Sequence, residues 1–207
     1  EGGGTSKVRL IPNGLDLATV PPAAASAAFR EELGIPRDVL VIGTLGRLLP
    51  WKGQHRFLAA AARVAHQLPA ARFLVIGSPL PGERRDYLAE LRQQADRLGI
   101  ADRVLFPGFR DDSLAALGAT DIVVNCSLDE PFGRVLIEAM ACSRAVVAFD
   151  SGAVPEIVQH GATGLLVPAG DIPALADAVL SLASDPARRQ ALGGAGRQRV
   201  AAQFSLD

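Results

Sequence analysis

Residues Val39 to Leu45 read VLVIGTL, an uninterrupted apolar run that leads into the loop Gly46 to Gly53 (GRLLPWKG). Directly after this loop, Gln54 to Leu68 places apolar side chains at helical spacing. A continuous apolar run is typical of a strand that is buried on both faces, and a strand followed by a helix is the first part of a βαβ unit. This stretch therefore predicts a parallel sheet covered by helices.

The same alternation continues along the chain. Strands separated by helices imply right-handed crossovers, so we predict an α/β fold with a doubly wound parallel sheet of about six strands. Ligands bind to such sheets beyond the carboxyl ends of the strands. The expected elements are strands at 73–76, 104–106, 122–125, 145–149 and 164–167, a loop at 21–26, a helix cap at Ser113, and helices at 27–33, 85–98, 113–118, 134–141, 173–183 and 186–204.

Length and composition restrict the class of protein. A chain of 207 residues, 49% of them hydrophobic, suits one domain with a sizeable core. The net charge of −1 argues against a nucleic-acid partner. No apolar run reaches the roughly 18–20 residues of a membrane span. Cys126 and Cys142 lie in apolar stretches, which predicts buried thiols in a reducing compartment, the cytoplasm or the cytoplasmic face of a membrane.

The ends of the chain suggest its place in a larger protein. Residues 1–6 contain three glycines and are predicted to be a linker or disordered, which leaves 7–207 as the domain. The chain begins at Glu1 and its only methionine is Met140. We therefore expect it to be a piece of a longer protein.

The loop after the first strand carries two cations, Arg47 and Lys52, at the predicted ligand-binding edge. Arginine offers a planar fork and lysine a point charge, and both suit a phosphate. The N-terminus of the following helix adds backbone N–H groups and a partial positive charge. The alternative is a pair of solvated surface cations, and these residues alone leave both interpretations open.

Two glutamates follow the fourth strand in the stretch Glu130 to Ala141 (EPFGRVLIEAMA). Glu138 lies in an otherwise almost wholly apolar helix, where a carboxylate is costly without a partner or ligand. Gly133 would let a ligand approach the helix N-terminus closely. The plainer interpretations are an i,i+4 ion pair between Glu138 and Arg134, and a helix-dipole role for Glu130.

Other chemistries lack their motifs. The sequence has no Asp-x-Asp, no phosphate-binding G-x-x-x-x-G-K-[ST] and no G-x-G-x-x-G after a strand, which argues against metal-dependent transferases of the GT-A type, nucleotide triphosphatases and dehydrogenases. His55, His66 and His160 show no metal-ligand spacing, so we expect no metal site. Trp51 is expected to pack in the core, with stacking on a ligand or shielding of Lys52 as the alternatives. The arginines at 188, 189, 197 and 199 are expected to form a solvated helix face, with membrane-surface attachment as a minor alternative.

The order of these motifs resembles the family 4 retaining glycosyltransferases, also called glycosyltransferase group 1. The two glutamates have the family's E-x7-E spacing, and the similarity covers residues 7–206. The matching pieces, in order, are Ile11–Asp16 (IPNGLD), Gly46-Arg47 with Lys52-Gly53, Val75–Gly77, Phe106–Gly108, Glu130–Ala141, Asp150–Val158 (DSGAVPEIV), Gly161–Pro168 (GATGLLVP) and Phe204-Ser205.

The resemblance implies the GT-B architecture, in which two Rossmann-like domains face each other across a cleft. This chain is similar to the C-terminal domain, which binds the nucleotide-sugar donor, and the N-terminal acceptor domain is absent from it. By similarity, Arg47 and Lys52 neutralise the donor diphosphate, and the backbone at Gly133, Arg134 and Val135 holds the distal phosphate. Glu138 would hold the ribose hydroxyls, the chain around Gly108 and Arg110 the base, and Glu130 the sugar hydroxyls in a catalytic role.

The resemblance therefore predicts retaining, metal-independent glycosyl transfer to an acceptor, with no cofactor beyond the donor itself. UDP and GDP are the leading candidates for the nucleotide. Two alternatives fit the same residues. One is a binding module for nucleotide sugars without catalysis. The other is a different GT-B enzyme, such as a sugar-nucleotide epimerase or a phosphorylase.

Overall fold

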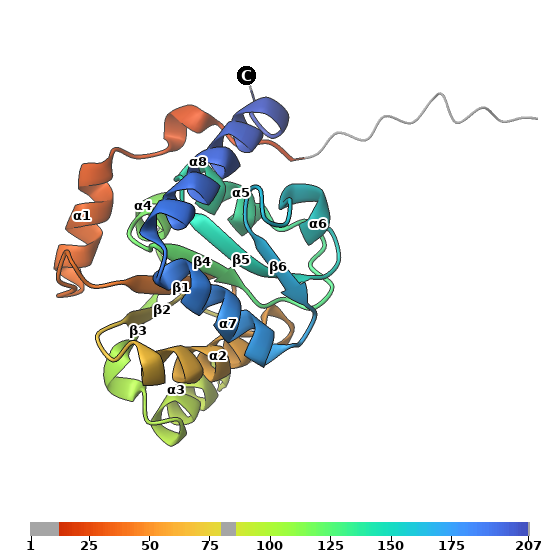
Figure 1. The fold of residues 1–207 in the computed structure, drawn as a ribbon. Helices are drawn as coiled ribbons and strands as arrows, with labels where there is room; N and C mark the ends of the chain where they lie inside the picture. Colours follow the sequence, from red (N-terminus) through yellow and green to blue (C-terminus); the bar gives the residue numbers. More distant parts are fainter. Residues whose placement is uncertain (1–12, 80–85, 207) are drawn as a thin grey trace, which may run out of the picture.

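The structure is a computed structural model that describes residues 13–79 and 86–206. At its centre lies a parallel sheet of six strands in the order β3-β2-β1-β4-β5-β6 (Figure 1). The strand order reverses between β1 and β4, which marks the point where such sheets bind ligands. The predicted fold class is confirmed. The strands are β1 (Val41–Leu45), β2 (Arg72–Ile76), β3 (Val104–Gly108), β4 (Ile122–Asn125), β5 (Ala145–Asp150) and β6 (Leu165–Pro168).

Helices cover both faces of the sheet (Figure 1). On one face lie α2 (Gln54–Gln67), α3 (Tyr87–Arg97) and α7 (Ile172–Ala183), and on the other α1 (Ala23–Glu32), α4 (Ser113–Gly118), α5 (Arg134–Ala141) and α8 (Pro186–Gln203), while α6 (Val154–Ile157) follows β5. Successive strand residues point to opposite faces, so that Val124 packs in the α2 layer and Val123 in the α5 layer. This double burial is why the strands are continuous apolar runs.

Two local predictions were wrong at the ends of helices. The loop predicted at 21–26 is helical from Ala23, because Pro22 occupies the N-cap, where it removes no helical hydrogen bond, and alanines follow it. Ser113 is the first residue of α4 and does not cap it; Asp112 is the N-cap, and neither side chain caps the helix. The predicted linker at 1–6 lies outside the described residues.

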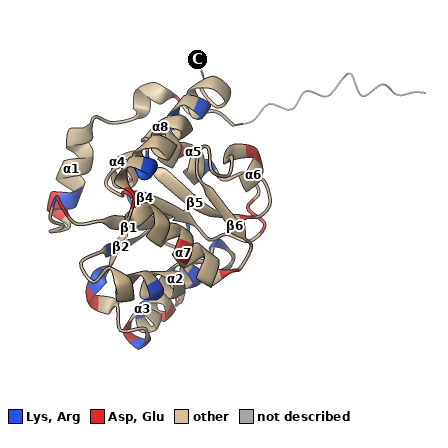
Figure 2. Cartoon of the chain, viewed as in Figure 1, with Lys and Arg blue, Asp and Glu red and all other residues tan. Residues whose placement is uncertain are grey.

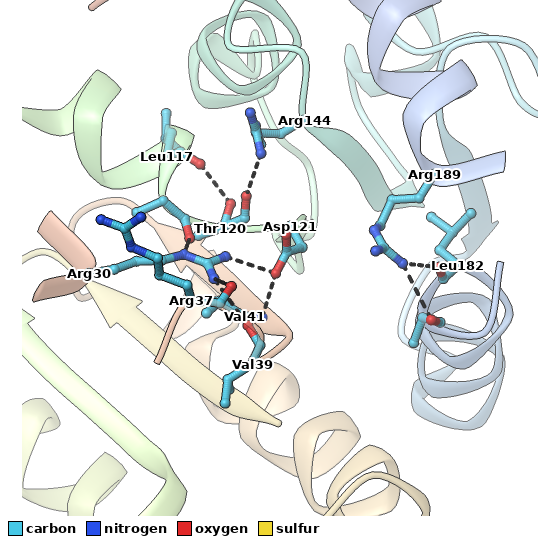
Figure 3. Close-up of polar contacts among 12 residues, drawn as sticks. Arg30, Arg37, Val39, Val41, Leu117, Thr120, Asp121, Arg144, Leu182 and Arg189 are labelled. Carbon is cyan, nitrogen blue, oxygen red and sulfur yellow. Dashed lines mark hydrogen bonds and ion pairs between the residues drawn. The ribbon is translucent and has the colours of Figure 1, made fainter. Parts of the chain in front are cut away.

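Three of the four arginines predicted to form a solvated face donate to carbonyls at helix ends. Arg188 and Arg197 are exposed as predicted, whereas the prediction was wrong for Arg189 and Arg199, which are partly buried. Arg189 donates to the carbonyl of Leu182 in the last turn of α7 (2.7 Å; Figure 3). Arg197 donates to Ala141 at the end of α5 (2.6 Å), and Arg199 to Ile157 at the end of α6 (2.7 Å). The last carbonyls of a helix lack partners within it, and the helix dipole favours a cation there.

Another arginine, Arg30, bonds several groups at the amino edge of the sheet. Arg30 donates to the carbonyls of Ala119 (2.7 Å) and Val39 (3.1 Å) and to the carboxylate of Asp121 (2.9 Å), which also accepts the N–H of Val41 (Figure 3). Charges of both signs are interspersed over the helices and loops (Figure 2), in line with the near-neutral balance of the sequence.

Candidate functional site

The two loops that flank the switch point meet through their charged residues. Lys52 ends the 3-10 helix η3 (Pro50–Lys52) after β1, and Glu130 lies in the loop after β4. The Nζ of Lys52 donates to both carboxylate oxygens of Glu130, at 2.9 and 2.7 Å. The side chain of Glu130 is 5% exposed and that of Lys52 is 20% exposed. The structure thus brings together two of the predicted site residues, Lys52 and Glu130.

The loop that carries Lys52 is fixed by a glycine. Gly53 has a φ of +78°, and a Cβ at this position would lie 2.1 Å from the carbonyl oxygen of Cys126. The absence of a side chain therefore lets the β1 loop lie directly against the end of β4. The N–H of Leu128 donates to the carbonyl of Trp51 (3.2 Å), which joins the same two loops a second time. Lys52 is held where it can reach Glu130.

The ammonium of Lys52 lies 4.3 Å from the ring centroid of Trp51, so this residue shields the charge, and the expectation that it packs in the core was wrong. The indole is 37% exposed and does not belong to the core. Arg47 is exposed in the same loop, and the amide of the buried Gln54 donates to its backbone carbonyl (2.8 Å). The two predicted phosphate-binding cations therefore share one loop.

The backbone of Glu130 is supported by residues to which the sequence assigned no role. The N–H of Ala153 donates to the carbonyl of Glu130 (2.9 Å), and the N–H of Asp129 donates to the hydroxyl of Ser151 (2.7 Å). Gly152 has a φ of +57°, and a Cβ there would lie 2.3 Å from the carbonyl oxygen of Glu130. The signal was present in the sequence as a Ser-Gly pair directly after an apolar strand, where a close backbone approach is expected.

Glu130 is charged in spite of its burial. Burial raises the pKa of its carboxyl, but hydrogen bonds from Lys52, Ser127 and Asn125 outweigh this and bring the pKa below its ordinary value. Hydrogen bonding and an opposite charge both favour an ionised carboxylate. The site therefore holds an acceptor whose oxygens are aimed by three neighbours.

Helix α5 begins beside this pair. Its N-cap is Gly133, with a φ of +88°, and no side chain caps the first turn. The N-terminus of α5, at Arg134 and Val135, thus presents backbone N–H groups and the positive end of the helix dipole without a capping side chain in front of them. An anion would be stabilised at this end of α5.

Glu138 lies one turn further along α5 and is bonded by the Nε of Arg134 (2.9 Å), which is the ion pair considered as the plainer interpretation. The side chain of Arg134 is 73% exposed and that of Glu138 only 13% exposed. Burial raises the pKa of Glu138, and the hydrogen bond and charge of Arg134 do not reverse this. A half-buried carboxylate with one exposed partner retains capacity to accept further hydrogen bonds.

Gly108 is the last residue of β3, and Arg110 follows it at the same edge of the sheet. Gly108 has a φ of +78° and turns the chain out of the strand. The guanidinium of Arg110 is bonded to Glu32 and Asp112, so it is engaged by acids of this chain and does not extend freely toward Lys52. The structure does not place the Arg110 side chain with the other predicted residues.

A separate groove lies away from these charged residues. A groove of about 700 Å³ runs along the opposite, amino edge of the sheet, between α1 and Arg144. Two of its arginines, Arg30 and Arg144, donate to backbone carbonyls (Figure 3), and the groove contains none of the predicted site residues. We place the candidate site at the carboxyl edge, where the charged residues converge.

Neither a metal-ligand cluster nor a membrane-spanning helix occurs among the described residues. No group of three or more His, Cys, Asp and Glu side chains among them could hold a metal ion. None of the helices in the described part of the chain is long and apolar enough to cross a membrane. The two cysteines are free and buried, as predicted.

Comparison with known proteins identifies the family. The model described as "Glycosyl transferases group 1" matches residues 26–199. A D-inositol 3-phosphate glycosyltransferase of Mycolicibacterium smegmatis is 37% identical over 203 residues, which cover 97% of this chain and 44% of that protein. The chain thus spans about half the length of the curated relatives it matches.

Solved structures agree with this match. HepE of Anabaena in complex with UDP has a TM-score of 0.90 and 34% identity, covering 98% of this chain and 55% of that one. The C-terminal domain of a glycosyl transferase group 1 family protein (LpcC) from Francisella tularensis has a TM-score of 0.82 and 31% identity, covering 94% of this chain and all of that domain. The chain therefore belongs to the group 1 glycosyl transferases.

Proposed function

We propose that this chain is the domain of a glycosyltransferase that binds a nucleotide-diphosphate sugar. The observation that carries the proposal is the meeting of Lys52 with Glu130 beside the start of α5. A cation, an aimed carboxylate and a helix N-terminus without a side-chain cap lie at one edge of the sheet. These groups are complementary to a sugar joined to a diphosphate.

Each residue then has a defined role. When the bond between the anomeric carbon and the diphosphate breaks, negative charge accumulates on the phosphate oxygens. Arg47, Lys52 and the N–H groups at Gly133, Arg134 and Val135 would stabilise that charge. The ammonium of Lys52 has three N–H donors, and two of them suffice for Glu130. Its remaining donor is available to a phosphate oxygen.

The carboxylates would hold the two sugars of the donor. Glu130 would accept hydrogen bonds from the hydroxyls of the transferred sugar and act in catalysis. Glu138 would accept from the ribose hydroxyls, while the backbone near Gly108 and Arg110 would meet the base. Because the Arg110 guanidinium is already bonded to Glu32 and Asp112, we assign this contact to the backbone and not to that side chain.

Related structures support a nucleotide sugar as the ligand. HepE, which is 34% identical to this chain, has been solved with UDP, with UDP and glucose, and with UDP-glucose. The base and the sugar of the donor used by this protein remain proposals, with UDP and GDP the first to test.

The wider assignment also belongs to this proposal. Residues 7–207 would form the donor domain, and a second domain of the longer protein would hold the acceptor across a cleft. Transfer would be retaining and would use the protein's cations to stabilise the diphosphate. The two buried thiols favour a reducing compartment, and we propose the cytoplasm.

Titration calorimetry of this chain with UDP, GDP and ADP tests the donor site. We expect saturable binding of one diphosphate, weakened by Lys52→Met and unchanged by Arg37→Met, which removes an exposed cation at the opposite edge. Binding that survives Lys52→Met unchanged would contradict the site, and no binding at millimolar ligand would contradict the function.

Product analysis with the complete protein tests the reaction. Transfer of the sugar to an acceptor hydroxyl, with the configuration at the anomeric carbon kept, is the expected result. An epimerised nucleotide sugar, or binding without turnover, would overturn the assignment as a transferase.

A further inference from the structure

The loop from Gly108 to Asp112 is tied to the fold by an arginine whose partners come from two elements. The Nη1 and Nη2 of Arg110 donate to the two oxygens of Glu32, at 2.7 and 2.9 Å. Its Nε and Nη2 donate to the two oxygens of Asp112, at 2.8 and 2.9 Å. The guanidinium carbon lies 4.9 Å from the ring centroid of Phe29. The planar guanidinium is therefore bonded to a carboxylate along each of two edges, and one of its faces lies against an aromatic ring.

Of the two acids, Glu32 connects the loop to a part of the chain that is distant in sequence. Asp112 is two residues from Arg110, at the N-cap of α4, so its contact with Arg110 is local. Glu32 and Phe29 lie on α1, 78 and 81 residues earlier in the sequence, and Phe29 is 2% exposed in the core. The ion pair with Glu32 thus fixes the loop against a helix that is itself anchored.

The loop occupies the edge at which the candidate site lies. The carbonyl of Gly108 accepts the N–H of Gly77 at the end of β2 (2.8 Å), and the carbonyl of Asp112 accepts the N–H of Ala116 in α4. Helix α4 packs on α5, which carries Glu138. Both ends of the loop are therefore held by backbone bonds, and the Arg110 side chain restrains the part between them.

We propose that Glu32 is a positioning residue for nucleoside recognition: through Arg110 it holds the backbone of residues 109–111 in the form that meets the base of the donor. This inference rests on the proposed function. It adds that the base is recognised by a preorganised loop, and that α1 sets its conformation. Loss of Glu32 should weaken the contact with the base and spare the contacts with the phosphates.

The experiment compares ligands with and without a base. Titration calorimetry is carried out with UDP, GDP and inorganic pyrophosphate on the wild-type chain, Glu32→Gln and Glu31→Gln. Glu31 is the matched control, because it is an exposed neighbour on α1 that takes no part in the Arg110 cluster and lines the groove on the other side of the helix. Hydrogen exchange of the amides at 109–111 is measured on the same three proteins.

In Glu32→Gln, we expect the Kd of the bound nucleoside diphosphate to rise about three- to fivefold, the size typical of a partly exposed ion pair. The Kd of pyrophosphate should stay the same, and exchange at 109–111 should become faster. Glu31→Gln should match the wild type in all three measurements. Arg110→Lys, which keeps the charge and loses the fork, should reproduce the effect and add little to Glu32→Gln.

Five results would overturn the inference. Unchanged nucleotide binding in Glu32→Gln, or unchanged exchange at 109–111, would remove the positioning role while leaving the proposed function intact. A parallel loss of pyrophosphate binding would show a general structural effect in place of base recognition. A wild-type chain that binds pyrophosphate and nucleoside diphosphates equally, or binds neither, would overturn both the inference and the proposed recognition of the donor nucleoside.

Discussion

Lys52 and Glu130, 78 residues apart in the sequence, form an ion pair in which one ammonium bonds both oxygens of one buried carboxylate. The pair joins the loops after β1 and β4 across the point where the strand order reverses. It therefore contributes both to the stability of the fold and to the site at which we place the donor.

Removing Lys52 should destabilise the chain, because Glu130 would keep a buried charge with fewer partners. We expect Lys52→Met to lower the free energy of unfolding by about 1–3 kcal/mol in urea denaturation. Adding Glu130→Gln should recover part of the loss, because the buried charge is then gone. Arg37→Met, which removes an exposed cation, should change stability by less than about 0.5 kcal/mol. A double variant as unstable as the sum of its singles would argue against the pairing.

The pH dependence of this pair has a definite sign. The pKa of Glu130 is lower in the folded chain than in the unfolded chain, so its ionised form stabilises the fold. The contribution is complete above the ordinary glutamate pKa and is lost as the pH falls through the lower folded value. We expect the stability difference between wild type and Glu130→Gln to be constant at neutral pH and to shrink in acid. Urea denaturation at a series of pH values measures it, and a difference that grows in acid would contradict the assignment.

Glu138 should behave in the opposite way. Its pKa is raised by burial, so stability decreases as the pH rises from the ordinary value through the folded value. Glu138→Gln should therefore stabilise the chain at neutral pH, since the lost bond to the exposed Arg134 contributes little. The same change should weaken nucleotide binding in calorimetry. The exchange of the exposed Glu156 for Gln serves as the control. A Glu138→Gln variant that is less stable and binds the nucleotide as tightly as the wild type would show that Glu138 is structural.

Gly152 can be tested against a glycine with the same backbone conformation and no neighbour. An Ala at 152 would place its Cβ 2.3 Å from the carbonyl oxygen of Glu130, whereas Gly34, with a φ of +66°, has nothing within 4 Å. We expect Gly152→Ala to lower the free energy of unfolding by about 2–4 kcal/mol and Gly34→Ala by about 1 kcal/mol. At position 34 the only cost is that of an alanine in the left-handed backbone conformation. Equal losses in thermal or urea unfolding would mean that the contact with Glu130 relaxes freely.

Arg199 should stabilise the support beneath Glu130. It donates to the carbonyls of Ile157 and Glu156, both at 2.7 Å, at the end of the short helix that follows Gly152. We expect Arg199→Met to lower the free energy of unfolding by about 1–3 kcal/mol, because charge-assisted bonds would be lost and carbonyls left unpaired. Arg188→Met, at an exposed position on the same helix, should be close to neutral. If the two variants are equally stable, the bonds of Arg199 to these carbonyls do not contribute to the stability of the fold.

The parts of the fold that could be predicted are those written in local patterns. Each strand of the sheet is a run of apolar residues, and Glu130 and Glu138 share one short motif. A strand that is buried on both faces needs an apolar residue at nearly every position, so the run VLVIGTL by itself indicates such a strand. The ion pair of Arg134 with Glu138, which the sequence offered as the plainer interpretation, is present, and it needs only helical spacing.

The features that could not be predicted depend on contacts whose partners cannot be recognised from their residue types. Arg189, Arg197 and Arg199 bond backbone carbonyls, which every residue possesses, so no partner residue could reveal them. The pairing of Glu32 with Arg110 joins positions 78 residues apart, and either residue alone is an ordinary surface charge. The support of Glu130 by Ala153 is likewise a bond between two backbones.

The arginine bonds to helix ends and the ion pairs of Arg110 should differ in their sensitivity to ionic strength. At 1 M salt the screening length falls to about 3 Å, which weakens attraction between exposed charges far more than short, partly buried bonds to carbonyls. The cluster of Arg110 with Glu32 and Asp112 is of the first kind, since both acids are about half exposed, and the arginines at the ends of α5, α6 and α7 are of the second. Concentrated salt should therefore increase the mobility of the loop after β3, while the bonds at the ends of α5, α6 and α7 persist.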